Sequence, residues 1–191
     1  MDVKPSEYHR EPARFRAETR AERVRIIWCD FEREAGGVDR LRKRLADGAT
    51  HIGMDPLETT VAEIREIGTD AVAIDVLTPT GFSALPGQFV KLSATIDGET
   101  VSRFYTISSA DTDGTFELTV SYDREEGGEF SEYLLSLRAG DSITITGPFG
   151  NDYYEGEDRV VVLAGGPGIG PAVAIAERAI ADGGTAAIVY R

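Results

Sequence analysis

The sequence predicts an antiparallel β-barrel followed by the start of an α/β nucleotide-binding unit. Between residues 60 and 146, short segments rich in β-branched and aromatic residues alternate with turn residues, which is typical of such a barrel. After residue 150 a continuous apolar segment, a run of glycines and a helical pattern follow one another. That order is typical of a β-α-β unit with a buried parallel strand.

Residues 1–58 match neither pattern. They hold 12 of the 20 Lys and Arg residues and 12 of the 33 Asp and Glu residues, so their charges cancel. Helical periodicity is moderate over residues 12–27 and 38–45. We therefore expect a charged extension that is helical or disordered. Because Met54 stands just before the first convincing strand, we also hypothesise that translation starts there and that residues 1–53 come from an upstream reading.

Six strands and one helix are predicted for the barrel, which we assign to residues 59–152. In the second strand Val72, Ile74 and Val76 alternate with small or polar neighbours, which indicates one buried face. Turn residues at 68–70, 85–87, 97–98 and 113–114 separate the segments. The helix is expected at 131–137, and the strands at 61–67, 71–77, 88–94, 101–108, 115–122 and 142–146.

The nucleotide-binding unit is predicted over residues 158–191. It comprises a strand at 159–164, a glycine turn at 165–170, a helix at 171–181 and a second strand at 186–190. A single unit of this kind cannot cover both faces of a parallel sheet. We therefore expect an incomplete nucleotide-binding domain whose uncovered apolar surface favours association or poor stability.

Composition excludes several classes of function. Residues 59–191 carry 8 basic and 21 acidic residues, so the whole formal charge of -13 lies there. This acidic surface disfavours nucleic acid and predicts a haloarchaeal, halophilic protein. No apolar run reaches about 18 residues and no signal peptide begins the chain, so we expect a cytoplasmic protein without membrane contact. His9, His51 and Cys29 all precede the barrel, and we expect no metal site.

The first candidate site is Arg103-Phe104-Tyr105-Thr106. Side chains alternate along a strand, so Arg103 and Tyr105 should share one face. A guanidinium can hold a phosphate and a phenol ring can stack on a flat ligand, with the Thr106 hydroxyl beside it. Taken alone, the four residues favour an ordinary strand with a surface arginine, and the motifs downstream change that interpretation.

Two glycine segments are the other candidate sites. Gly127, Gly128, Phe130 and Ser131 lie where a helix begins, and a helix N-terminus attracts anions. Ser131 also suits a helix cap that needs no ligand. The third site is the turn between an apolar strand and a helix, which can hold a diphosphate and contains Gly165, Gly166, Gly168 and Ile169.

In this order the motifs resemble the ferredoxin–NADP reductase family of flavoproteins. The family pattern is R-x-Y-[ST], G-x-x-S, G-D-x-[VIL]-x-[VIL]-x-G-P-x-G and G-G-x-G-I-x-P. It is matched here by residues 103–106, 128–131, 140–150 and 165–171. Residues 85–90 are similar to the family's P-G-Q-[FY]-[VL] strand.

The resemblance implies a six-stranded barrel that binds FAD, followed by a nicotinamide domain. It implies that Arg103 pairs with the FAD diphosphate, that Tyr105 stacks on the isoalloxazine, and that Thr106 bonds near flavin N5. Tyr105 and Thr106 would thus be the catalytic residues. The second site would hold the diphosphate from the opposite side, and the third would receive the nicotinamide nucleotide. Phe104, Gly127, Phe130 and Ile169 complete the expected cofactor contacts.

Three departures from the family pattern affect the expected function. Pro167 replaces a common Thr, Gly170 replaces a common Ala, and the chain ends at Arg191, where the family continues. We expect an FAD-dependent oxidoreductase that passes electrons between NADH or NADPH and an unidentified acceptor, such as a partner protein. The alternatives are an FAD-binding subunit that needs a partner chain and a cofactor-free structural remnant. FMN in place of FAD also remains open.

Overall fold

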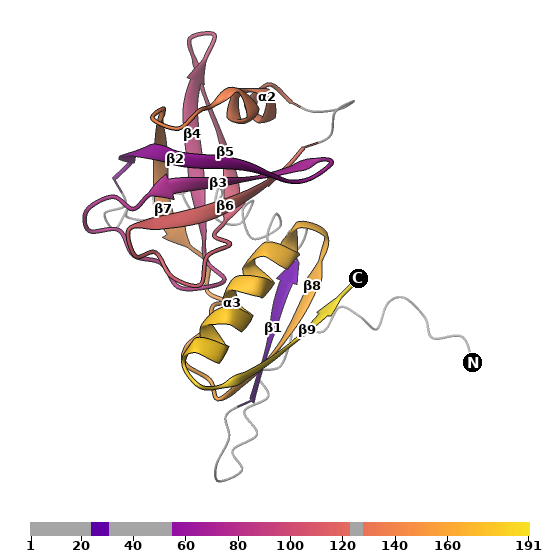
Figure 1. Cartoon of the computed structure of the whole chain (residues 1–191). Coiled ribbons are helices and arrows are strands. Elements are labelled where there is room, and N and C mark those ends of the chain that lie inside the picture. Colours follow the sequence, from indigo (N-terminus) through magenta and orange to yellow (C-terminus); the bar gives the residue numbers. More distant parts are fainter. Residues whose placement is uncertain (1–23, 31–54, 123–127) are drawn as a thin grey trace, which may run out of the picture.

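The computed structural model describes residues 24–30, 55–122 and 128–191. These residues form a barrel with one short helix, and an α/β unit lies below it in the view of Figure 1. A linker between the sixth barrel strand and the α/β unit joins the two.

The barrel is one six-stranded antiparallel sheet in the order β5-β4-β7-β2-β3-β6. An isolated bridge between Ile107 and Leu118 joins its two edges, so the sheet closes at that end. This confirms the predicted six-stranded antiparallel sheet. Its strands are β2 (Leu57–Gly68), β3 (Ala71–Leu77), β4 (Phe89–Ile96), β5 (Glu99–Thr106), β6 (Thr115–Ser121) and β7 (Ser142–Phe149).

Alternating side chains fill the barrel, as the pattern predicted. Val72, Ile74 and Val76 of β3 are at most 4% exposed. They lie opposite Val120, Leu118 and Phe116 of β6, which are equally buried. Burying a Val, Leu, Ile or Phe side chain contributes about 1.5–3 kcal/mol, so these pairs are a main source of barrel stability.

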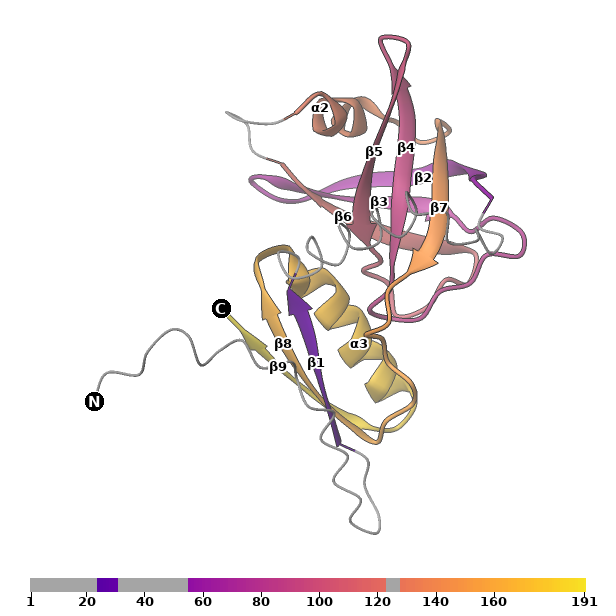
Figure 2. The same ribbon diagram turned by 180° about the vertical axis from the view of Figure 1, so that it is seen from behind.

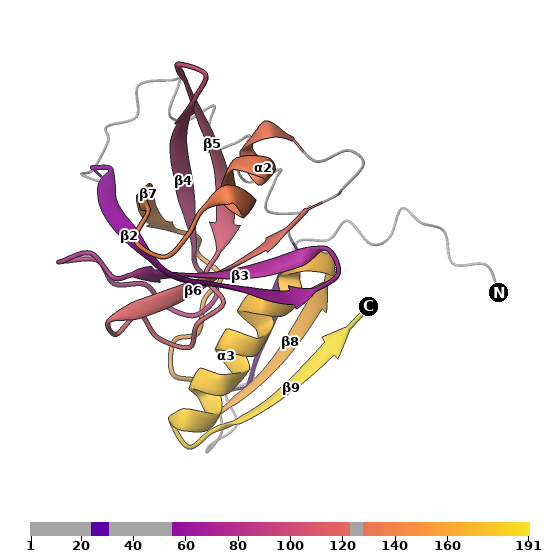
Figure 3. The same ribbon diagram turned by 45° about the horizontal axis from the view of Figure 1, so that its top comes forward.

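Helix α2 (Glu129–Ser136) packs beside β4 and β5 (Figure 3). Its buried residues, Phe130 and Leu134, belong to the barrel core. The helix begins two residues earlier than the sequence predicted, because Gly128 and not Ser131 is the N-cap. Ser131 is therefore the third helical residue.

The α/β unit is a three-stranded parallel sheet in the order β1-β8-β9. Its members are β1 (Val24–Asp30), β8 (Arg159–Gly165), a 3-10 turn η2 (Gly166–Gly168), α3 (Ile169–Ala181) and β9 (Thr185–Tyr190). Helix α3 covers one face of this sheet, with Ala172, Ile175 and Ala179 against Val162 and Ile27.

Strand β1 corrects the expectation for residues 1–58. Residues 24–27, which the helical periodicity of residues 12–27 included, are extended and pair in parallel with β8. Ile27 is 2% exposed and Cys29 is 6% exposed, so this segment contributes to the core of the α/β unit. The remaining residues predicted to be helical, 12–23 and 38–45, lie outside the described residues.

The second face of the sheet, opposite to α3, turns toward the viewer in Figure 2. Ile26 of β1, Val161 and Leu163 of β8 and Val189 of β9 lie on it by register, and Ile26 is 55% exposed. Neither of the two helices in the described ranges covers this face. No helix in these ranges is long and apolar enough to span a membrane.

Candidate functional site

Arg103 and Tyr105 lie on the same face of β5, as predicted. In the antiparallel pairing they face Leu92 and Val90 of β4. Arg103 is exposed, and its Nη1 donates to the carbonyl oxygen of Ser102 at 2.9 Å. Within the described part of the chain no carboxylate pairs with this guanidinium. Its charge is therefore available to an anionic ligand.

The ring of Tyr105 links β5 to the first turn of α2. It stacks on Phe130, with ring centroids 6.3 Å apart and an interplanar angle of 22°. Burial raises the pKa of the Tyr105 phenol to about 12, and the nearby positive charge of Arg103 lowers it by less. The phenol therefore remains uncharged at physiological pH, which suits contact with an aromatic ligand.

The N-terminus of α2 has no side-chain cap. The backbone N–H groups of Ser131 and Glu132 donate to Gly128 O at 2.9 and 3.2 Å. The N–H groups of Glu129 and Phe130 come before these bonds, where helix geometry provides no internal acceptor. These groups can bind an anion, although the carboxylates of Glu129 and Glu132 in the same turn oppose it. The predicted site residue Gly127 lies outside the described residues.

Thr106 lies on the opposite face of β5, at its carboxyl end. It pairs with Phe89 in the ladder and is 8% exposed. Its hydroxyl has no hydrogen-bond partner among the described side chains. Two residues later, Ser108 touches α3, so Thr106 lies close to the boundary between the barrel and the α/β unit.

Phe104, like Thr106, lies on the face of β5 opposite to Arg103 and Tyr105. It lies on the outer face of the sheet in a cluster with Phe89 and Phe149, with centroids 5.6 and 5.9 Å apart and edge-to-face rings. Alternation along the strand explains this placement, because Phe104 stands between two residues of the other face. The cluster gives Phe104 a packing role that needs no ligand.

The glycines of the third site differ in their surroundings. A Cβ added at Gly165 or Gly166 would meet nothing within 4 Å, so a ligand can approach this backbone closely. A Cβ at Gly168 would lie only 1.9 Å from the carbonyl oxygen of Cys29. Gly168 is therefore needed for packing against the end of β1. Ile169 is half-buried and begins α3.

The sequence interpretation missed strand β1, whose carboxyl end packs against Gly168 of this turn. Arg25 Nη1 of β1 bonds Glu155 Oε2 at 2.6 Å and Glu157 Oε1 at 2.8 Å, which ties the strand to the linker before β8. The density of β-branched residues in residues 24–30 was the available signal. Their long-range partner was not available from the sequence.

The family model described as "Oxidoreductase FAD-binding domain" matches residues 58–154. Among curated relatives, the toluate 1,2-dioxygenase electron transfer component of Pseudomonas putida is 28% identical over 172 residues, covering 88% of this chain and 49% of the relative. NADH-cytochrome b5 reductase 1 of Eremothecium gossypii is 41% identical over 90 residues, covering 44% of this chain and 30% of the relative. The chain thus spans about half or less of the length of these relatives.

Solved structures show the same fold. The ferredoxin reductase of carbazole 1,9a-dioxygenase is 25% identical, with a TM-score of 0.61, over 74% of this chain and 44% of that one. A ferredoxin NADP+ reductase from Neisseria gonorrhoeae, solved with bound FAD and NADP, is 18% identical with a TM-score of 0.62. It matches 72% of this chain and 58% of its own, and this likeness concerns the fold alone.

Proposed function

The chain belongs to the oxidoreductase FAD-binding domain family, and on that premise we propose that it is a flavin-dependent oxidoreductase. It passes electrons between a nicotinamide nucleotide and an acceptor. The observation that carries the proposal is the guanidinium of Arg103, which has no carboxylate partner among the described residues. It lies beside the Tyr105 ring and the N-terminus of α2, which has no side-chain cap. All three lie inside the matched segment.

The residues present fit FAD. Arg103 and the N–H groups of Glu129 and Phe130 would hold the diphosphate through charge-assisted hydrogen bonds. Tyr105 would support the ring system with its uncharged face, and the Thr106 hydroxyl would orient the flavin edge. When bound, the flavin supplies the chemistry: it accepts a hydride and passes on single electrons. The protein binds, orients and excludes water.

The α/β unit would receive the nicotinamide nucleotide. Open backbone at Gly165 and Gly166 before the N-terminus of α3 supports this role. In α/β sheets ligands bind at the carboxyl ends of strands, where the connections diverge, and here these are the ends of β8 and β1. We assign FAD binding to residues 59–152 and the nicotinamide side to residues 158–191 together with β1.

The electron acceptor is proposed to be a partner protein. Two relatives carry names that pair a reductase with an oxygenase: the toluate 1,2-dioxygenase electron transfer component and the glycine betaine monooxygenase reductase subunit of Pseudomonas aeruginosa. We further propose a cytoplasmic location. We also propose a halophilic, haloarchaeal source, because the net charge is -13 and residues 59–191 are rich in carboxylates.

The deciding experiment is a visible absorption spectrum of the protein purified in concentrated KCl, recorded before and after addition of FAD and then NADH or NADPH. A bound-flavin spectrum that bleaches with the nucleotide supports a working reductase. A bound flavin that stays oxidised would instead favour a subunit that needs a partner chain. Protein that carries no flavin and refuses both FAD and FMN would overturn the proposal and leave a structural remnant.

A further inference from the structure

The first turn of α3 touches the barrel at Gly170. A Cβ added there would lie 2.7 Å from Ser108 Oγ and 3.2 Å from Thr119 Oγ1. Separations under about 3 Å are not tolerated between non-bonded heavy atoms without a shift of the neighbour. A side chain at this position would therefore force Ser108 to shift.

The two hydroxyls that Gly170 faces form a hydrogen bond with each other. Ser108 Oγ and Thr119 Oγ1 are 2.7 Å apart, and both residues are half-buried. We call them the hydroxyl pair. Because each hydroxyl holds the other, Ser108 cannot rotate away from α3 without giving up this hydrogen bond. Moving Ser108 away from α3 therefore costs this hydrogen bond.

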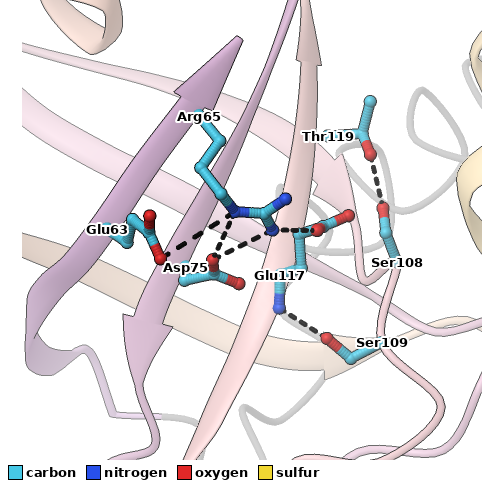
Figure 4. A network of polar contacts seen from close by, with 7 residues as sticks. All are labelled: Glu63, Arg65, Asp75, Ser108, Ser109, Glu117 and Thr119. Carbon is cyan, nitrogen blue, oxygen red and sulfur yellow. Dashed lines mark hydrogen bonds and ion pairs between the residues drawn. The ribbon is translucent and has the colours of Figure 1, made fainter. Parts of the chain in front are cut away.

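The chain around Ser108 is hydrogen-bonded to Glu117 of β6, and the Glu117 carboxylate is linked in turn to β2 and β3 (Figure 4). Ser108 N–H donates to Glu117 O at 2.9 Å, and Glu117 N–H donates to Ser109 Oγ at 2.6 Å. The Glu117 carboxylate accepts from Arg65 Nη2 of β2 at 2.7 Å, and Arg65 also bonds Asp75 of β3 at 3.1 Å. These hydrogen bonds fix the position of the segment after β5 relative to β6.

A second close contact joins the same two units. A Cβ at Gly87, before β4, would lie 2.7 Å from Asp152 O of the linker and 3.3 Å from Ile175 Cδ1 of α3. Its φ of +103° also favours glycine. Helix α3 therefore rests on the barrel at two points, and the glycine turn at its N-terminus is held in place.

We propose that Gly170 and the hydroxyl pair form the seat that fixes the distance between the two halves of the site. This inference rests on the proposed function. Thr106 lies two residues before Ser108, and Gly165 and Gly166 lie just before Gly170. The seat thus sets the separation between the hydroxyl that orients the flavin and the turn that receives the nicotinamide nucleotide. Gly170, Ser108 and Thr119 are positioning residues.

The test combines Gly170→Ala with a compensating Ser108→Ala. Gly170→Ala alone should raise amide hydrogen exchange in the first turn of α3 and around Ser108, with FAD affinity unchanged. Flavin reduction by NADH or NADPH should slow by about tenfold or more, because small misplacements are costly for transfer between bound groups. In the double variant the nearest hydroxyl is removed, so exchange and rate should both return toward the wild type. Val173→Ala, at an exposed position of α3, is the matched control.

Unchanged hydrogen exchange in Gly170→Ala, or no recovery of exchange in the double variant, would overturn the contact on which the seat depends. Both results can be measured by amide hydrogen exchange, without enzymatic turnover. If the wild type binds no flavin, the proposed function fails, and exchange and rescue still decide whether Gly170 and Ser108 are in contact. If flavin is reduced at equal rates in all variants while exchange changes as expected, the contact exists but does not position the site, and the inference fails.

Discussion

Under the proposed function, we expect FAD binding to depend on Arg103. Its guanidinium is exposed and, among the described residues, donates to one backbone carbonyl, that of Ser102, at 2.9 Å. A hydrogen bond to a charged group contributes about 1.5–3 kcal/mol, so Arg103→Ala should weaken FAD affinity by roughly 10- to 150-fold. Titration of flavin fluorescence measures this directly.

The control for Arg103 is another arginine that carries a similar charge elsewhere. Arg178 of α3 pairs with Asp182 and lies outside the site, so Arg178→Ala should leave FAD affinity unchanged. Equal affinity in the wild type and Arg103→Ala would contradict the assignment of the guanidinium to the diphosphate.

The buried phenol of Tyr105 makes the stability of the fold depend on pH in the alkaline range. Its pKa is about 12 in the folded chain against 10.0 for an unperturbed phenol, chiefly because of burial. The folded state therefore holds the proton more tightly, and the resulting stability is complete below about pH 10 and is lost as the pH rises towards 12. The loss should be about 2 kcal/mol, measured by urea unfolding of the flavin-free protein between about pH 9 and pH 12.

Other tyrosines and lysines also titrate in this range, so Tyr105→Phe is the necessary comparison. The variant cannot ionise at this position and should lose less stability across the same interval. Parallel curves for the wild type and the variant would show that Tyr105 is not buried against Phe130 as described.

At the scale of elements, β1 is tested by two neighbouring isoleucines. Ile27 is 2% exposed and lies under α3, while Ile26 is 55% exposed on the other face. A truncated buried isoleucine costs about 2–5 kcal/mol, whereas an exposed one costs within about 0.5 kcal/mol. Ile27→Ala should therefore unfold the α/β unit at much lower urea than Ile26→Ala.

This pair also tests whether the N-terminal segment belongs to the fold. If residues 1–53 precede the natural translation start and do not belong to the fold, Ile27 has no core contacts. Both substitutions would then have equally small effects. Circular dichroism with urea titration separates the outcomes, because the barrel has its own core and should respond little to either change.

At the scale of the whole molecule, the acidic surface predicts a response to salt. The net charge is -13, and mutual repulsion of carboxylates destabilises the compact state until salt screens it. A gain of about 2 kcal/mol in concentrated KCl would raise the thermal midpoint by roughly 4–8 °C. A variant with Asp97→Asn, Glu99→Gln and Asp113→Asn, all at exposed positions, should respond less. Stability that improved on removing salt would contradict this.

The sequence by itself determined the local elements and the order of the three candidate sites. Alternation in β3 and β6, the apolar run of β8 and the helix after the glycine turn are properties of neighbouring residues, so they are visible in the chain. The sharing of one face by Arg103 and Tyr105 follows from the two-residue repeat of a strand. The same repeat could also have placed Phe104 on the other face.

Only the tertiary structure decided which distant segments meet. Ile27 pairs with Val162, although the whole barrel lies between them in the sequence. Gly170 of the α/β unit approaches Ser108 of the barrel. No local pattern encodes such pairs, because β-branched residues suit many strand partners and a glycine shows only that space is scarce. Burial of β1 under α3 made residues 24–30 a strand, since the apolar area that α3 covers outweighs a moderate helical periodicity.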